Sequence, residues 1–190
     1  MSTIVAVAKH NSICIAADSL TSFGDTRQAA EFVIDYDKIL RVVDGTYIGI
    51  VGSAAHHLVM RNLFDKHADK IDFTDRFSIF ESMRVIHPIL KEEYFLNSKD
   101  DDDDSYESSR VDALIVNRNG IFGLYSLREV DQYSRFWAVG SGAEFALGAM
   151  KVAYELFDDA EAIAHAGIEA GACFDSSSAL PMTSYSLETS

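Results

Sequence analysis

The order in which strand-like and helix-like segments follow one another is the feature that most limits the possible folds. Short apolar runs rich in β-branched residues and bounded by turn residues indicate strands. Apolar residues at three- and four-residue spacing indicate helices. The sequence predicts four strands, two helices, three strands, two helices and a last strand. Two antiparallel sheets stacked between two pairs of helices fit this order, so we expect an α+β fold, a four-layer αββα sandwich.

The first four strands are expected to form two hairpins. They are predicted at Thr3–Ala8, Ser12–Ala17, Lys38–Val43 and Thr46–Val51. The tripeptide Lys9-His10-Asn11 is a tight polar link within the first pair. Asp44-Gly45 lies within the second pair, and Asp-Gly is a strong hairpin signal. The polar stretch between the two hairpins, Asp18–Asp37, is expected to be a loop.

The remaining elements follow from the same patterns. Helices are predicted at Ala54–Lys66, Thr74–Leu96 and Ala143–Phe157, and from Asp159 or Ala160 to about Cys173. Strands are predicted at Val111–Val116, Ile121–Ser126, Phe136–Val139 and Thr183–Leu187. Thr74 or Asp75 is the expected N-cap of the second helix. Pro88 lies inside that helix, where proline can produce a kink.

Length and composition are those of one ordinary globular domain, expected to span residues 1–190. Apolar residues make up 48% of the chain, which is enough for a sizeable core. No apolar run approaches the ~18–20 residues needed to cross a membrane. Lys9 and His10 interrupt the apolar start of the chain, which lacks the pattern of a signal peptide. We therefore expect a cytoplasmic protein without an internal repeat or a domain linker.

The net charge of −14 argues against nucleic acid and anionic membranes as partners, because both would be repelled. The aspartate run Asp100–Asp104 is expected to be a solvated loop. An acidic rim of a chamber and a divalent-ion site are the alternatives for this run. Cys14 and Cys173 lie in apolar stretches and are expected to be reduced, buried thiols. No cysteine or histidine spacing typical of a metal site is present, so no metal or cofactor is expected.

Ser2 is a candidate nucleophile because the initiator Met1 is commonly removed before a small residue. Ser2 would then carry a free α-amine, which titrates near pH ~8. Such an amine can act as general base for the hydroxyl of the same residue. A Met-Ser start is common, however, so the pattern carries little weight without its context.

That context begins with residues 2–26, STIVAVAKHNSICIAADSLTSFGDT. This segment resembles the opening of the proteasomal β-type subunits, which are N-terminal-nucleophile hydrolases. The similarity is greatest to HslV and to the beta-proteobacterial proteasome homologue family. Further matches follow in order at Ala16-Ala17-Asp18, Asp37-Lys38-Ile39, Val51-Gly52-Ser53, Gly140-Ser141-Gly142 and Phe174-Asp175-Ser176-Ser177-Ser178. Each match is short, but together they span nearly the whole chain.

The resemblance implies a catalytic set around Ser2, which matches the nucleophile. Lys38 matches the lysine beside the nucleophile, where a cation favours the deprotonated hydroxyl and lowers the pKa of the amine. Asp18 matches the carboxylate that orients this lysine; the alternative is an ordinary aspartate after a strand. Gly52 matches the residue whose backbone N–H faces the developing oxyanion; the alternative is a glycine that only ends the strand.

The resemblance also implies a second set of residues, which form a hydrogen-bond network around the N-terminal amine. Ser141 matches the serine that hydrogen-bonds the amine and helps pass protons; alternatively, it caps the helix that begins at Ala143. Asp175 and Ser178 match the Asp-x-x-Ser motif of this network. In many members of the family the same turn binds a cation through backbone carbonyls, so a monovalent or divalent cation near these two residues is a further possibility.

The chain departs from the family pattern at two places. Serine replaces the usual threonine nucleophile, whose methyl group restricts χ1. Ser2 is therefore expected to be chemically competent but less preorganised. The turn after Asp175 reads Ser-Ser-Ser-Ala, where a glycine often follows the last serine, so this turn departs from the family pattern but keeps its hydroxyls.

The resemblance implies a self-compartmentalising peptidase. Such subunits form rings of six or seven, and two stacked rings of 12 or 14 identical subunits in total enclose the active sites. An ATP-driven unfoldase can serve as partner. Peptides or unfolded proteins would be the substrates. Tyr36, Gly49 and Ser53 are the expected substrate-binding residues. The alternatives are a ring-forming or binding homologue that retains Met1 and lacks activity, and a hydrolase of small amides.

Overall fold

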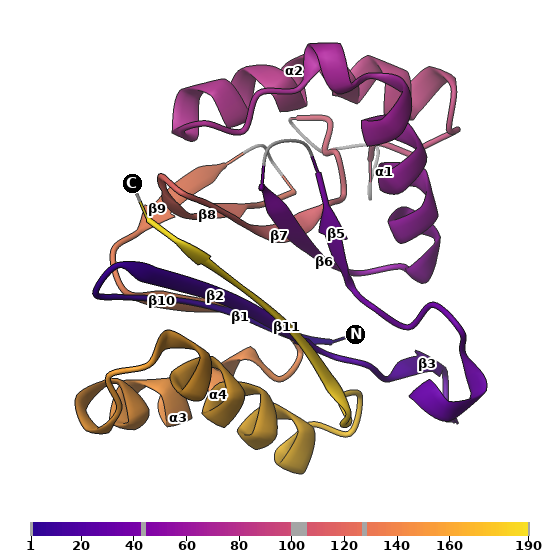
Figure 1. Ribbon diagram of the computed structural model, residues 1–190. Helices are drawn as coiled ribbons and strands as arrows, with labels where there is room; N and C mark the ends of the chain where they lie inside the picture. Colours follow the sequence, from indigo (N-terminus) through magenta and orange to yellow (C-terminus); the bar gives the residue numbers. More distant parts are fainter. Residues whose placement is uncertain (1, 43–44, 100–105, 127–128, 190) are drawn as a thin grey trace.

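Two antiparallel sheets lie face to face, and each is covered on its outer side by a pair of helices (Figure 1). This architecture belongs to a computed structural model that describes residues 2–42, 45–99, 106–126 and 129–189. It confirms the expected αββα sandwich. The aspartate run at 100–104 and Asp44 of the predicted hairpin lie outside the described residues.

The sheets have the strand orders β10-β1-β2-β11 and β5-β6-β7-β8-β9. The first consists of β10 (Phe136–Gly140), β1 (Thr3–Lys9), β2 (Ser12–Asp18) and β11 (Met182–Glu188). The second consists of β5 (Ile39–Arg41), β6 (Tyr47–Val51), β7 (Asp112–Asn117), β8 (Gly120–Leu124) and β9 (Val130–Tyr133). The central strands β1 and β2 are joined by the expected tight turn, with Lys9 paired to Ser12.

The helices of the described chain form the outer layers. They are α1 (Ala54–Lys66), α2 (Arg76–Glu92), α3 (Ala143–Leu156) and α4 (Ala160–Phe174), with short 3₁₀ turns η1 (Ala30–Phe32) and η2 (Ala68–Lys70). Asp75 caps α2, because its side chain accepts hydrogen bonds from the N–H groups of Phe77 and Ser78. Pro88 lies within α2, and the helix continues past it to Glu92.

The core consists of three layers because side chains alternate across each strand. On β1, Ile4 packs between the two sheets with Leu114, while Val5 points the other way and packs with Met150 of α3. Met83 of α2 belongs to the third layer, between the helices α1 and α2 and the five-stranded sheet. Both faces of β1 are therefore buried, which explains its nearly continuous apolar sequence.

Three strands were not expected from the sequence. The strands β3 (Thr21–Phe23) and β4 (Thr26–Gln28) form a small hairpin inside the predicted loop Asp18–Asp37. The strand β9 is mostly polar and pairs with β8 at the edge of its sheet. Short and polar edge strands lack the apolar run that marks a strand in a sequence.

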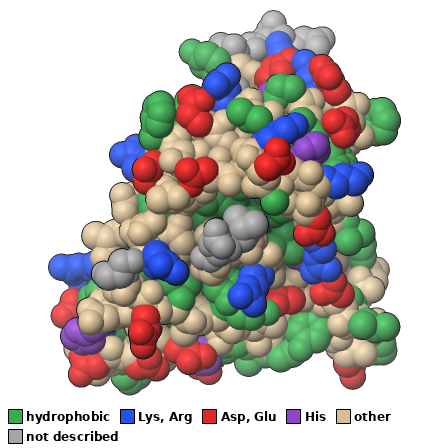
Figure 2. All heavy atoms as spheres, turned by 45° about the horizontal axis from the view of Figure 1, so that its top comes forward, with side chains coloured by type: hydrophobic (Ala, Val, Ile, Leu, Met, Phe, Trp, Pro, Cys, Tyr) green, Lys and Arg blue, Asp and Glu red, His purple; other side chains and the backbone are tan. Residues whose placement is uncertain are grey.

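The charged surface, the helices and the two cysteines can be compared with the expectations from the sequence. On the face shown in Figure 2, acidic and basic side chains are interspersed rather than gathered into patches of one sign. None of the helices in the described part of the chain is both long and apolar enough to cross a membrane. Cys14 is buried, as expected, whereas Cys173 is exposed, because the last turn of α4 points it outward. Burial raises the pKa of the Cys14 thiol to about 12.

Two helix glycines should respond in opposite ways to alanine. A Cβ at Gly171 of α4 would lie 2.5 Å from Oγ1 and 2.6 Å from Cγ2 of Thr3, whereas Gly148 of α3 has no such atom within 4 Å. We expect Gly171→Ala to lower the free energy of unfolding by about 1–3 kcal/mol through overpacking. Gly148→Ala should raise it by about 0.5–1 kcal/mol. Urea unfolding at equal protein concentration measures both, and equal effects would contradict the close packing of α4 on β1.

Candidate active site

Ser2 lies immediately before β1 and lines a pocket of about 360 Å³. It is buried, with 5% of its surface exposed. The next residue, Thr3, pairs with Gly140 of β10, and Ile4 pairs with Ala17 of β2. Ser2 is therefore held between two neighbouring strands, in a position fixed by the register of the central sheet.

Asp18 ends β2 beside the start of β1, and its side chain is fully buried. One carboxylate oxygen, Oδ1, accepts the N–H of Thr3 at 2.9 Å. The other, Oδ2, accepts the N–H groups of Leu20 at 3.0 Å and Ala179 at 3.1 Å. Three backbone amides and one cation satisfy this buried charge, which would otherwise be costly. The carboxylate that the resemblance assigns to the orientation of a lysine therefore also anchors the start of β1.

Lys38 is the cation that pairs with Asp18. Its Nζ donates to Asp18 Oδ1 at 2.7 Å, and only 13% of its side chain is exposed. Burial lowers the pKa of Lys38 below its ordinary value, and the charge of Asp18 offsets only part of that decrease. Lys38 lines the same pocket as Ser2. A buried ammonium group at this pocket can stabilise a negative charge that develops on a nearby oxygen.

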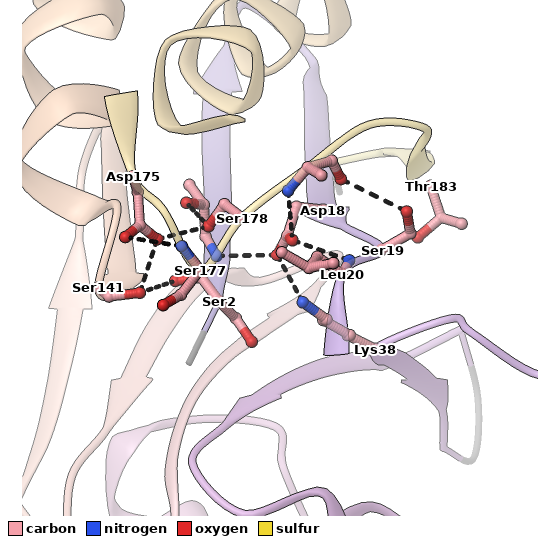
Figure 3. Close-up of polar contacts among 12 residues, drawn as sticks. Ser2, Asp18, Ser19, Leu20, Lys38, Ser141, Asp175, Ser177, Ser178 and Thr183 are labelled. Carbon is pink, nitrogen blue, oxygen red and sulfur yellow. Dashed lines mark hydrogen bonds and ion pairs between the residues drawn. The ribbon is translucent and has the colours of Figure 1, made fainter. Parts of the chain in front are cut away.

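A chain of hydroxyl groups lies on the other side of Ser2 (Figure 3). Asp175 Oδ2 accepts the hydroxyls of Ser141 and Ser178, each at 2.7 Å. Ser178 Oγ is also 2.7 Å from Thr3 Oγ1. Because the proton of Ser178 goes to the carboxylate, Thr3 must be the donor in that contact. The network therefore runs from Thr3 to Asp175 and on to Ser141, around the start of β1.

Ser141 contacts the backbone of Ser2 only weakly. Its Oγ is 3.4 Å from the carbonyl oxygen of Ser2 and 2.7 Å from Asp175. A hydroxyl has one proton, so the shorter contact takes it and the lone pairs stay open to a donor. The alternative role of Ser141 as a helix cap is wrong, because the N-cap of α3 is Gly142, without a side-chain hydrogen bond.

Asp175 is ionised at neutral pH. Burial alone would raise the pKa of its carboxyl group, but the hydroxyls of Ser141 and Ser178 and the N–H of Ser177 bring the pKa below its ordinary value. The turn does not need a glycine after the last serine. Ala179 occupies that place without a positive φ, and its N–H reaches Asp18.

Gly52 follows β6 and lines the pocket with Ser2 and Lys38. Its φ of +115° lies in a region that favours glycine. The pocket walls also include two of the three expected substrate-binding residues, Tyr36 and Ser53. Gly49 is not among the described residues that line it. A Cβ there would meet Ile4 side-chain atoms at 2.6 Å, so Gly49 lets the two sheets approach closely. The close approach of the sheets accounts for this glycine, and its contact with substrate stays a prediction.

Several residues of the site had no recognisable signal in the sequence. Thr3 belongs to the hydroxyl network through its contact with Ser178. Its place next to Ser2 in the sequence was the one feature that could have indicated this. The pocket walls include Asp35, Ile50 and His57. Only the fold brings the loop before β5, the end of β6 and the first turn of α1 to one place. Among the described residues, no group of three or more His, Cys, Asp or Glu side chains could hold a metal ion.

The αββα layers and the arrangement of Ser2, Asp18 and Lys38 at the start of the first strand define a proteasome-type subunit. No family model matches the chain. No match was found among curated proteins.

Solved structures give the particular family within this class. Thiobacillus denitrificans BPH shares 40% identity with this chain at a TM-score of 0.92, and the match covers 99% of this chain and 98% of that one. The same protein in complex with Epoxomicin has the same identity and TM-score, with 99% of each chain covered. Eukaryotic HslV from Trypanosoma brucei, at 19% identity and a TM-score of 0.71 over 98% of this chain and 99% of that one, supports the fold alone. The chain belongs to the bacterial proteasome homologue family, within the N-terminal-nucleophile hydrolases, which confirms the family expected from its sequence.

Proposed function

We propose that this protein is a peptidase subunit whose nucleophile is the hydroxyl of Ser2 after Met1 has been removed. The observation that carries this proposal is that Ser2 and Lys38 line one pocket, with the buried Asp18 beneath them. A free amine on Ser2 would lie close to the hydroxyl of the same residue. Nucleophile and general base would then share one residue.

The proposed reaction follows from these positions. The Ser2 amine takes the proton of Oγ, and Oγ attacks the carbonyl carbon of the peptide bond. Lys38 favours the negative charge on Oγ, and the backbone N–H of Gly52 donates to the oxyanion. The amine returns the proton to the leaving nitrogen, and water then hydrolyses the ester. Ser141, which keeps its lone pairs open, would accept a hydrogen bond from the amine.

Asp175 and Ser178 would keep Ser141 oriented for this role. The Asp175 carboxylate accepts three hydrogen bonds, two from hydroxyls and one from the N–H of Ser177. These three bonds hold the carboxylate in the network. A cation bound by the carbonyls of the turn has no part in the proposed steps.

We also propose that the subunits assemble into stacked rings that enclose the active sites, in the cytoplasm. Membership of the bacterial proteasome homologue family supports self-assembly. Twelve or fourteen subunits are the expected sizes, and an ATP-dependent unfoldase is the expected partner. Light scattering should give a mass about twelve or fourteen times the 21.0 kDa of the chain. A stable monomer at micromolar concentration would contradict the ring.

Intact-mass spectrometry tests the proposed nucleophile. Protein purified from its native cells should lack one methionine, and a peptide electrophile should add one adduct per chain. The relative from T. denitrificans forms a complex with Epoxomicin, which makes that compound a second ligand to test. Retention of Met1 with no adduct would instead support a ring-forming homologue without activity.

A further inference from the structure

The pocket beside Ser2 is lined by both apolar side chains and carboxylates. Leu20, Val33 and Ile50 are among the apolar residues that line it. Asp35 and Asp37 line it as well. A pocket with this composition can hold a long hydrocarbon stem with a polar group at the end.

Two basic residues, Lys38 and His57, are among the described residues that line the pocket, and neither adds an uncompensated positive charge. The ammonium group of Lys38 is 2.7 Å from the buried carboxylate of Asp18. His57 also lines the pocket, and its pKa is lowered below the ordinary value by burial and by the charge of Arg61. His57 is therefore neutral at pH 7 and adds no positive charge to the pocket.

Asp37 is fixed as a negative group in the wall. Its carboxylate accepts the N–H of Ile39 at 2.9 Å, the hydroxyl of Thr183 at 2.8 Å and the hydroxyl of Tyr185 at 2.5 Å. These neutral donors hold the carboxylate in place but do not cancel its charge. The hydroxyls come from β11, so the last strand orients this side of the pocket.

Asp35 is the more accessible carboxylate, with 55% of its side chain exposed. Its Oδ2 is 2.6 Å from Nη1 of Arg61, a residue of α1 that is not among the described residues lining the pocket. An exposed pair of this kind contributes little to stability, so its partners can exchange. A cationic substrate side chain would compete with Arg61 for Asp35.

We propose that this pocket selects a lysine or arginine side chain on the acyl side of the cleaved bond. The inference rests on the proposed function, because it assumes that the acyl group attaches to Ser2. Leu20, Val33 and Ile50 would pack against the hydrocarbon stem, while Asp35 and Asp37 attract the cationic end. A glutamate side chain would meet the same carboxylates and be repelled.

Peptide substrates that differ only in the residue before the cleaved bond test this selectivity. The wild type should cleave the arginine substrate with a higher kcat/KM than the leucine and glutamate substrates. Asp35→Asn should lower the arginine-to-leucine ratio of kcat/KM by about two- to fivefold, the range expected for an exposed charge pair. Arg61→Gln should raise the same ratio, because it leaves Asp35 open to the substrate.

The opposite signs of these two effects distinguish selectivity from damage to the fold. Asp158→Asn and Lys151→Gln are matched controls, because they remove the same charges at exposed positions of the α3 and α4 layer. Neither control should move the ratio. A ratio that stays constant in both Asp35→Asn and Arg61→Gln would overturn the proposal, as would a preference of the wild type for leucine or glutamate.

A binding measurement separates this proposal from the proposed catalytic role of Ser2. Acetylated peptides with a C-terminal arginine, leucine or glutamate amide can be titrated into the Ser2→Ala protein and followed by NMR. The arginine peptide should bind tightest, and Asp35→Asn in the same background should reduce its advantage over the leucine peptide by about two- to fivefold, because Asp37 remains. If wild-type protein cleaves nothing but this order of binding holds, only the proposed function fails. Equal binding of the three peptides would refute the selectivity.

Discussion

Replacement of Ser2 by alanine should reduce peptide cleavage by at least about 10³-fold, because loss of a nucleophile leaves only residual catalysis by the rest of the site. Adduct formation with a peptide electrophile should also disappear. Alanine is small enough for Met1 still to be removed, so the amine and the network of Asp175 would remain. Stopped-time cleavage assays and intact mass measure the two effects.

The matched variant is Ser2→Thr, which keeps the hydroxyl and adds the methyl group that is usual in the family. Since the methyl group restricts χ1, this variant should cleave at least as fast as the wild type. Its melting temperature and that of Ser2→Ala should remain close to the wild-type value. Undiminished labelling of Ser2→Ala would exclude Ser2 as the nucleophile. The proposal that the subunits form rings would stand without the proposed chemistry of Ser2.

Most of the fold could be predicted because apolar patterns specify both faces of each central element. The limits of α1 agree with the predicted helix Ala54–Lys66, and α2 begins after Asp75, one of its two predicted caps. The prediction failed for β3, β4 and β9, where burial is partial and the pattern weak. These strands exist because of pairing with a neighbour, and cross-strand partners cannot be read from a local sequence.

The residues of the site could be predicted where short sequence motifs of this chain match motifs of the family. These motifs pointed to Asp18, Lys38 and Asp175, which the structure brings around the start of β1. They could not show that Asp18 accepts three backbone amides, because Thr3 reaches it through the pairing of β1 with β2 and Ala179 reaches it only where the chain returns after α4. Gly49 shows a related limit. A glycine two residues before the end of β6 is compatible with a pocket or with close sheet packing, and its close approach to Ile4 depends on the opposite sheet.

Lys38→Met should slow both cleavage and electrophile labelling by about 10²- to 10³-fold, the loss typical when one stabilising group for a developing charge is removed. It should also lower the free energy of unfolding by about 1–3 kcal/mol, because Asp18 loses a charged hydrogen-bond partner. A loss of activity alone would therefore not prove a catalytic role, since a weakened fold could produce it.

Lys9→Met provides the matched control for that ambiguity. The side chain of Lys9 is 14% exposed, against 13% for Lys38, and its Nζ donates to the carbonyls of Tyr154 and Phe157. Loss of the Lys9 ammonium group should destabilise the fold by a similar amount. It should leave the labelling of Ser2 close to the wild-type rate, because Lys9 lies at the opposite end of β1 from Ser2. Equal labelling rates in the two variants, measured well below their melting temperatures, would show that Lys38 only anchors Asp18. A loss of labelling confined to Lys38→Met would instead require its charge at the nucleophile.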